Sequence, residues 1–279
     1  MGSKSYQIDI IHECDAKIDG SLVFSALPRS EWVNLEKPNE NNQITIGINY
    51  LLIRGNGLNM LVDAGIGNLQ GNKARAMYEI GDIIPINERL SYFGLSPDDI
   101  THVVFTHLHF PHCGGAFTKK DDCIIPIFKN AEFFVQKREW IQAVSPNELT
   151  RTYYDVHNLL PLVESNRLHL ITGDVEIADN IYIEVTGGHT GSHQIVSVVG
   201  KHKRVVFPGD ICPTPYHVEL GIRNAFDIEP TEVLNVRKKL ILKAFAHEAI
   251  IAFSHSKQAV FYELTDIDGF IKAVKFNEN

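Results

Sequence analysis

Histidine groups that directly follow apolar runs constrain this chain more than any other feature. The chain has 13 histidines, and the first group, THLHFPH, begins at Thr106 after the apolar run HVVF. A second group ends at His189 after IYIEV, a third ends at Asp210 after RVVF, and a fourth ends at His255 after AIIAF. A rigid scaffold gathers distant residues at one point by placing them at the ends of several strands. We therefore expect these groups to converge on one site.

The residue types in these groups are metal ligands. His107 and His109 are two positions apart, so on an extended segment they point the same way, and His112 lies one turn further on. Imidazole and carboxylate groups suit zinc, iron or manganese, and a catalytic metal keeps one coordination position open for water. HxH alone is weak evidence, and His255 alone fits an ordinary buried histidine equally well. The whole set predicts a divalent metal. Zinc is our first expectation, although these ligand types do not choose between zinc and iron, and manganese is possible.

The composition limits the partners. Twenty-six basic and 34 acidic residues give a net charge of −8, which disfavours a nucleic-acid or anionic-membrane partner. No apolar run approaches the ~20 residues of a membrane span, and the N-terminus has no signal-peptide pattern. The four cysteines form no CxxC pair, which indicates reduced thiols. We expect a cytoplasmic protein that acts on a small molecule and associates with no membrane.

The apolar runs alternate with helical patterns. A helix is expected over residues 87–93, and a long amphipathic helix is expected to start at Pro230, since proline suits the first helical position, and to end near residue 247. Strands in runs with helices between them favour an α/β or α+β class over an all-β class. The spread of the histidine groups predicts a single domain over residues 1–279. The expected strands cover residues 44–53, 58–62, 102–105, 131–136, 181–185, 195–199, 204–207 and 249–253.

Taken together, these motifs resemble those of the metallo-β-lactamase-fold hydrolases over nearly the whole chain. Within that superfamily the chain resembles the quorum-quenching N-acyl-homoserine-lactone lactonases, through LPRSEWVNL near Pro28, VQKREW near Trp140 and DICPTPYH ending at His217. The matching superfamily motifs are LVDAG at 61–65, THLHFPHCGG at 106–115, TGGHTGSH at 186–193, FPGD at 207–210 and FSHS at 253–256.

The resemblance implies a four-layer αββα sandwich with a two-metal site at one edge of the sheets. In relatives a hydroxide held between the metals attacks the substrate carbonyl, which one metal polarises. The resemblance would then make Asp210 and His112 catalytic residues. The implied ligands are His107, His109 and His189 for one metal, His112 and His255 for the other, and Asp210 as the bridge.

Three more residues match positions near the site in the family. Asp63 would orient a ligand histidine, and His193 would do the same. His217 falls where residues of the substrate pocket lie in lactonase-like members. Substrate specificity is expected in the loops at residues 69–84 and 145–163.

One residue departs from the family pattern HxHxDH, because Pro111 replaces the aspartate. Proline has no ligand atom and no N–H group, so the second metal keeps only His112, Asp210 and His255. Three outcomes stay open: two metals with changed surroundings, one metal, or a pocket that has lost hydrolysis. Cys113 is a weaker candidate for a replacement ligand than for core packing.

The leading functional hypothesis is a metal-dependent hydrolase of an ester, a lactone or a related carbonyl compound. The alternative is a catalytically impaired metal-binding or ligand-binding protein on the same fold. A nuclease is disfavoured, because a net charge of −8 is unhelpful for binding a phosphate backbone. A redox role with iron is left open by the ligand types. A homodimer is a weaker expectation.

Overall fold

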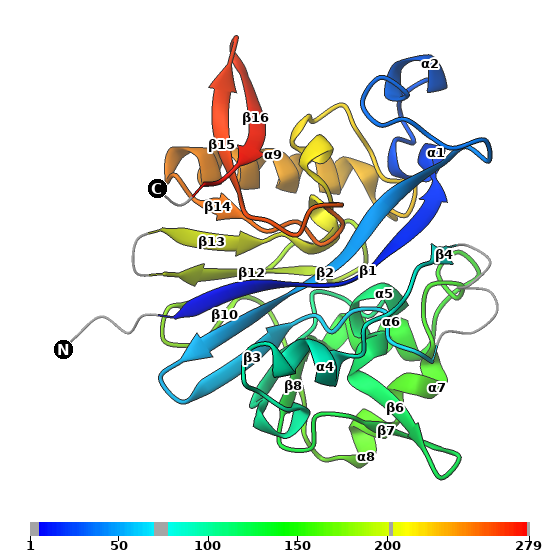
Figure 1. Cartoon of the computed structure of the whole chain (residues 1–279), viewed down its shortest axis with the longest axis vertical. Coiled ribbons are helices and arrows are strands. Elements are labelled where there is room, and N and C mark those ends of the chain that lie inside the picture. Colours follow the sequence, from blue (N-terminus) through cyan, green and yellow to red (C-terminus); the bar gives the residue numbers. More distant parts are fainter. Residues whose placement is uncertain (1–5, 70–77, 201–202, 278–279) are drawn as a thin grey trace.

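Two seven-stranded β-sheets pack face to face in the computed structural model, which describes residues 6–69, 78–200 and 203–277 (Figure 1). A separate two-stranded sheet pairs β6 (Phe117–Lys120) with β7 (Cys123–Pro126). The first sheet consists, in order across the sheet, of β4 (Glu79–Ile80), β1 (Gln7–Asp19), β2 (Gln43–Gly55), β3 (Leu58–Val62), β5 (His102–Val104), β8 (Glu132–Gln136) and β9 (Leu168–Ile171). The second consists of β10 (Val175–Ala178), β11 (Ile181–Val185), β12 (Gln194–Val199), β13 (Arg204–Phe207), β14 (Ile250–Ile251), β15 (Tyr262–Ile267) and β16 (Phe270–Lys275).

Helices cover the outer faces, so the layers run helix, sheet, sheet, helix (Figure 1). The second sheet is covered by α9 (Pro230–Ala246), whose buried residues share a core with that sheet. No helix in the described ranges is long and apolar enough to cross a membrane. The helices on the side of the first sheet are α4 (Ile86–Ser91), α5 (Phe110–Cys113), α6 (Lys137–Val144), α7 (Val156–Leu159) and α8 (Pro161–Glu164). The other helical segments are α1 (Gly20–Val23), α2 (Arg29–Trp32) and 3-10 turns at Pro97–Asp99, Gly114–Ala116, Gly209–Ile211 and Pro215–Val218.

The two faces of β2 show why the chain forms these layers. Leu51 and Ile53 belong to the core between the sheets, whereas Tyr50 and Leu52 belong to the core under the helices. Alternate residues of a strand point to opposite faces, and a strand buried on both faces reads as a continuous apolar run. Each fully buried aliphatic side chain contributes about 1.5–3 kcal/mol. The expected αββα sandwich is confirmed.

Most predicted elements are confirmed with small shifts at their ends. The hairpin of β2 and β3 pairs as expected, the predicted helix at 87–93 is α4, and the long helix from Pro230 is α9. The predicted strand at 249–253 is shorter, because only Ile250–Ile251 pairs as β14. In the predicted specificity loop at 69–84, residues 70–77 lie outside the described residues.

Strand β1 was not predicted, and a bulge explains why. The register of β1 against β2 shifts between His12 and Cys14, so Glu13 is an extra residue without a partner on β2. An extra residue reverses the alternation of inward and outward side chains, and the sequence QIDIIHECDAKID therefore lacks a clean period of two. The hairpin of β15 and β16 was also not predicted, because its residues are mostly half-exposed and form no apolar run.

The bulge directs the carboxylate of Glu13 into the interior. Glu13 is 1% exposed, and its two oxygens accept hydrogen bonds from the backbone N–H groups of Ile66 and Gly67 at 2.6 and 2.9 Å. These residues lie in the loop that follows β3, and a Cβ on Gly67 would meet the carbonyl oxygen of Gly114 at 2.6 Å. Glu13 thereby anchors the loop of Ile66 and Gly67, which packs backbone against backbone on the turn at Gly114–Ala116.

This buried carboxylate couples stability to pH. Burial is the main cause that raises the pKa of Glu13 from 4.5 to about 7. The folded chain binds this proton more tightly than the unfolded chain, so the stability that Glu13 contributes is greatest below about pH 4.5 and falls as the pH rises to about 7. Glu13→Gln cannot ionise, so its free energy of unfolding relative to wild type should rise by about 2–3 kcal/mol between about pH 5 and about pH 8.

Urea unfolding at several pH values measures this difference. Glu148→Gln is the control, because Glu148 is exposed and its removal should leave the pH dependence as in wild type. A Glu13→Gln variant that keeps the wild-type pH profile would show that Glu13 does not titrate in this range.

Candidate metal centre

Six buried side chains with nitrogen or oxygen donor atoms meet where strands of both sheets end. They are His107, His109 and His112 after β5 of the first sheet, and His189 after β11, Asp210 after β13 and His255 after β14 of the second sheet. None of the six is more than 9% exposed. The structure therefore brings together, from four separate segments, all the side chains that the sequence proposed as ligands.

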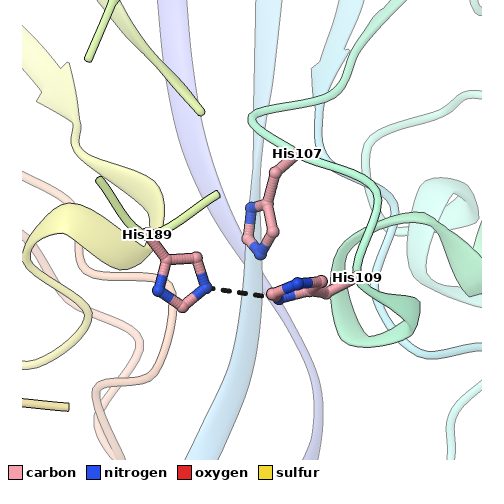
Figure 2. A group of neighbouring side chains, drawn as sticks. All are labelled: His107, His109 and His189. Carbon is pink, nitrogen blue, oxygen red and sulfur yellow. Dashed lines mark hydrogen bonds between the residues drawn. The ribbon is translucent and has the colours of Figure 1, made fainter. Parts of the chain in front are cut away.

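Three histidines form the first group, which Figure 2 shows with the rings turned toward a common point. His107, His109 and His189 each offer a nitrogen, and these three atoms lie within 4.8 Å of one another. Nε2 of His189 is 3.2 Å from Nδ1 of His109. The ring centroids of His107 and His109 are 4.5 Å apart, and the two rings meet edge to face.

The hydrogen bonds of His107 and His189 direct the protons of these two rings away from the centre of the first group. The Thr106 hydroxyl donates to the Asp63 carboxylate, so it accepts from Nδ1–H of His107 at 3.0 Å. Nδ1–H of His189 donates to the Asp227 carboxylate at 2.8 Å. A neutral imidazole has one N–H group, so Nε2 of both rings presents a lone pair to the centre of the group.

The second group contains His112, His255 and Asp210. Nδ1–H of His112 donates to Asp63 at 2.8 Å, and Nδ1–H of His255 donates to the carbonyl oxygen of Gly47 at 3.0 Å. Their Nε2 atoms are 3.3 Å apart, and each is 3.3 Å from Oδ1 of Asp210. Two neutral rings with these tautomers would place two lone pairs against each other, so a positive charge, either a proton or a metal ion, is required between them.

Asp210 lies between the two groups. Its Oδ1 faces His112 and His255, and its Oδ2 is 3.4 Å from Nε2 of His189. Burial opposes ionisation of Asp210, but His255 and His112 outweigh burial and hold the pKa well below its ordinary value. The carboxylate is therefore charged and has one oxygen toward each group.

The histidines differ in charge. Burial, with the neighbouring His112 and His109, keeps the pKa of His107 well below its ordinary value, so this ring is neutral and free to bind a metal. Burial would also lower the pKa of His112, but Asp210 and Asp63 outweigh it and raise that pKa to about 10. In the chain alone, a proton on His112 supplies the positive charge that the second group needs, and a metal ion can replace it.

Asp63 contacts both the start of the segment after β5, at Thr106, and the ring of His112. Its Oδ1 accepts from the backbone N–H of Thr106 at 2.7 Å, and its Oδ2 accepts from His112. Asp63 has a φ of 63°, a left-handed conformation that costs a non-glycine residue free energy and is concentrated at functional sites. The backbone N–H of Ala64 also donates to the His112 carbonyl at 2.7 Å. This geometry matches the orienting role expected for Asp63.

His193 and His217 lie in different surroundings. Nδ1 of His193 bonds to the Thr186 hydroxyl at 2.8 Å, and its Nε2 accepts from the backbone N–H of Asp210 at 3.1 Å. His193 therefore positions the backbone of Asp210 and bonds to no histidine. His217 is fully buried, its Nδ1 bonds to Thr214 at 2.7 Å, and its Nε2 has no partner among the described residues.

Sequence reasoning missed the support behind His189. Asp227 accepts from His189, and Nη2 of the buried Arg237 on α9 lies 3.9 Å from Asp227. Gly188 has a φ of 81°, and a Cβ there would lie 2.9 Å from the backbone nitrogen of Val233, so the His189 loop packs directly on α9. Asp227 stands in no recognisable motif, and only its position just before the predicted helix could have suggested it.

Strand β2 supports His255 in a way that the sequence also did not reveal. A Cβ on Gly47 would lie 2.3 Å from the carbonyl oxygen of Ser256. The side chain of Asn49 donates to the carbonyl oxygens of Phe253 and Ser256 at 3.2 and 2.7 Å. A strand of the first sheet thus holds the ligand-bearing segment of the second sheet.

Pro111 lies in the first turn of α5 and is buried. Proline is well tolerated there because the first turn of a helix needs no N–H donor, and the backbone N–H of His112 still reaches the carbonyl of His109 at 2.9 Å. The position therefore keeps the local backbone but offers no donor atom. Cys113 does not replace it, since its thiol donates to the Leu108 carbonyl at 3.4 Å within the core.

The residues present fit a divalent metal. Nε2 of His107 is buried and has no hydrogen-bond partner among the described residues, and such an atom costs about 1–3 kcal/mol. Neutral imidazoles joined by one carboxylate are a donor set that suits zinc, iron or manganese. The first group supplies three nitrogens, and Asp210 links it to the second group, so the site can hold one ion or two.

Comparison with known proteins establishes the family. The family model described as the metallo-beta-lactamase superfamily matches residues 45–255, a range that includes all six donor residues. The chain belongs to the metallo-beta-lactamase superfamily. The resemblance inferred from the motifs is confirmed.

Individual relatives are similar over part or all of the chain. An N-acyl homoserine lactonase of Bacillus thuringiensis is 30% identical over 128 residues, which are 45% of this chain and 42% of that protein. The match thus spans less than half of the curated relative. A probable metal-dependent hydrolase from Staphylococcus aureus is 26% identical over the full length of both chains, with a TM-score of 0.88. The dizinc quorum-quenching lactonase AidC is 15% identical, with a TM-score of 0.79 over all of this chain and 97% of its own, and supports the fold alone.

The first group can be tested by removing one histidine. His189→Ala deletes a nitrogen at the centre of the three-histidine group, so we expect the content of tightly bound metal to fall by at least one ion per chain. Elemental mass spectrometry of protein purified without chelator measures this content. His169→Ala is the control, because His169 is half-exposed and bonds to Glu132 on the outer part of the first sheet. Equal metal contents in the two variants would contradict this assignment.

Proposed function

We propose that the chain is a metal-dependent hydrolase that cleaves an ester or a lactone, with an N-acyl homoserine lactone as the first substrate to test. The observation that carries the proposal is the convergence of five imidazoles and one carboxylate in a buried site, with the protons of four of the five rings directed outward. The names of the Bacillus relatives and of AidC support the choice of substrate. Zinc is the metal that we propose, since AidC is described as a dizinc protein.

The chain's own residues hold and orient the reacting groups. His107, His109 and His189 would bind one cation, and His112, His255 and Asp210 would bind a second. When bound, a divalent cation supplies a Lewis acid for the substrate carbonyl and a water whose pKa is lowered toward about 7. The burial of all six donors excludes bulk water from these charges, which strengthens every electrostatic interaction in the site.

Proton transfer must rely on residues other than position 111. Pro111 carries no proton, whereas Asp210 is the carboxylate with one oxygen toward each group. We assign the proton-accepting role to Asp210, with His112 beside it at 3.3 Å.

Aromatic side chains lie beside the first group. The ring of Tyr153 lies 5.2 Å from that of His109, and Phe226 lies 5.5 Å from Tyr153. Tyr78 and Phe110 meet edge to face at 5.6 Å nearby. These rings offer apolar surface, which favours a substrate with an acyl chain next to its reacting carbonyl.

Hydrolysis provides the direct test. Wild-type protein should open the ring of N-hexanoyl homoserine lactone, lose this activity in a chelator and regain it with added zinc. Asp210→Asn should lower kcat by about 10²–10⁴-fold, the usual contribution of a positioned acid–base group, whereas Asp98→Asn at an exposed turn should match wild type. A protein that binds metal but hydrolyses neither lactones nor simple esters would favour the impaired, binding-protein alternative.

The number of metals can be tested at position 111. The second group has two imidazoles and a shared carboxylate, which is less negative charge than the family pattern provides. Pro111→Asp restores a carboxylate there. After incubation with excess zinc and removal of weakly bound ions, we expect metal content to rise from about one ion per chain in the wild type to about two. Pro111→Ala removes the proline without adding a ligand and should stay at the wild-type value. About two ions in wild-type protein would show that the missing carboxylate is tolerated.

A homodimer and a cytoplasmic location stay predictions. The net charge of −8 continues to argue against a nucleic-acid substrate.

A further inference from the structure

A buried carboxylate outside the ligand set contacts both loops of the first group. Glu139 lies in the first turn of α6 and is fully buried. Its Oε1 accepts from the backbone N–H of Leu108, the residue between His107 and His109, at 3.0 Å. Its Oε2 accepts from the hydroxyl of Thr190 at 2.5 Å. Thr190 directly follows His189.

A third bond connects the same carboxylate to Tyr154, whose ring lies beside His109. The Tyr154 hydroxyl donates to Oε1 of Glu139 at 3.1 Å, and the Tyr154 ring lies 5.0 Å from the ring of His109. Three donors therefore converge on the two oxygens of Glu139 from three segments of the chain. Each donor lies next to a histidine of the first group, in sequence or in space.

The helix that carries Glu139 makes a second contact with the same loop. One turn later on α6, Oε1 of Gln142 accepts from the backbone N–H of Gly191 at 2.9 Å. The loop that bears His189 leaves the second sheet, whereas α6 follows β8 of the first sheet. Helix α6 thus holds a loop of the opposite sheet at two points, and Glu139 is the point that also holds the His107–His109 segment.

We propose that Glu139 is a positioning residue that fixes the separation of the His107–His109 pair from His189 and so determines the affinity of the three-histidine group for its metal. This inference rests on the proposed function, because it assumes that the group binds a metal. Burial of a carboxylate is costly unless its hydrogen bonds are satisfied. Two bonds of Glu139 go to the loops that carry the three histidines, and the third goes to Tyr154 beside His109. The second group, with His112 and His255, has its own supports and receives no bond from Glu139.

Glu139 acts here through geometry, and two variants separate geometry from charge. Glu139→Ala removes all three bonds. Glu139→Gln keeps an oxygen for Leu108 and Tyr154 and presents an amide N–H to the Thr190 hydroxyl, so it preserves the connections without the charge. We therefore expect Glu139→Gln to retain most of the affinity that Glu139→Ala loses.

The measurement is the zinc dissociation constant, obtained by competition with a chromophoric chelator at one neutral pH. The binding step that disappears in His189→Ala identifies the three-histidine group. Glu139→Ala should weaken that step about 10- to 100-fold, the range seen when residues that orient ligands are removed. Glu139→Gln should stay within about threefold of wild type, and any binding at the second group should be unchanged in both variants.

Glu13→Gln is the matched control. Glu13 is also a buried glutamate that accepts backbone N–H groups, and its bonds in the described structure go to Ile66 and Gly67 rather than to a histidine loop. The zinc dissociation constant of the first group in Glu13→Gln should equal that of wild type. An equal loss in Glu13→Gln and Glu139→Ala would overturn the inference, because a general weakening of the fold would then explain both. An unchanged constant in Glu139→Ala, or an equal loss in Glu139→Gln, would overturn it too.

A milder variant covers the case in which Glu139→Ala does not fold. Thr190→Val removes one bond at constant volume and should weaken the same step, whereas an unchanged constant would contradict the proposal. Wild-type protein that binds no zinc would overturn the proposed function and this inference together. Wild-type protein that binds zinc with no effect of Glu139→Ala would overturn this inference alone.

Discussion

The direction of four imidazole protons governs the arrangement of the candidate site. Nδ1–H of His107, His112, His189 and His255 each has an acceptor behind it, and the lone pairs face inward. Buried lone pairs that face one another repel unless a positive charge lies between them. The acceptors must therefore be held rigidly, and much of the surrounding structure serves to hold them. The left-handed Asp63, the buried Asp227 before α9 and the carbonyl of Gly47 on β2 are parts of that support.

The convergence of the candidate ligands was predictable from the sequence because each group follows an apolar strand, where short-range pattern and position in the fold agree. The hairpin of β2 and β3 and the helix α9 were predictable for the same reason. The supports of the ligands were not, because a carboxylate such as Glu139 or Asp227 acts through contacts across the sandwich that leave no local pattern. Strand β1 escaped prediction because the bulge at Glu13 breaks its alternation, although that bulge is what turns the carboxylate inward.

Pro111 leaves the backbone of the candidate site intact while offering no donor atom. The backbone of α5 needs no N–H at that position, so the substitution costs the helix little. The donor atoms of His109 and His112 on either side stay directed into the site. Relative to the family pattern, Pro111 therefore changes only the charge near the site. The second group, with His112 and His255, has less negative charge around it than the pattern HxHxDH would provide. Such asymmetry favours one tightly held ion beside a more readily exchanged one.

The donors of the site are divided evenly between the two sheets, with three on the segment after β5 and three on segments of the second sheet. A cation held by His107, His109 and His189 would therefore cross-link the two sheets of the sandwich, because His107 and His109 follow the first sheet and His189 follows the second. Its binding energy would add to the cohesion of the sheets, in proportion to how much more strongly the folded chain binds it than the unfolded chain does. Conditions that strip the metal would then loosen the joint between the halves as well as stop the chemistry. Metal supply would in this way set the lifetime of the folded protein in addition to its activity.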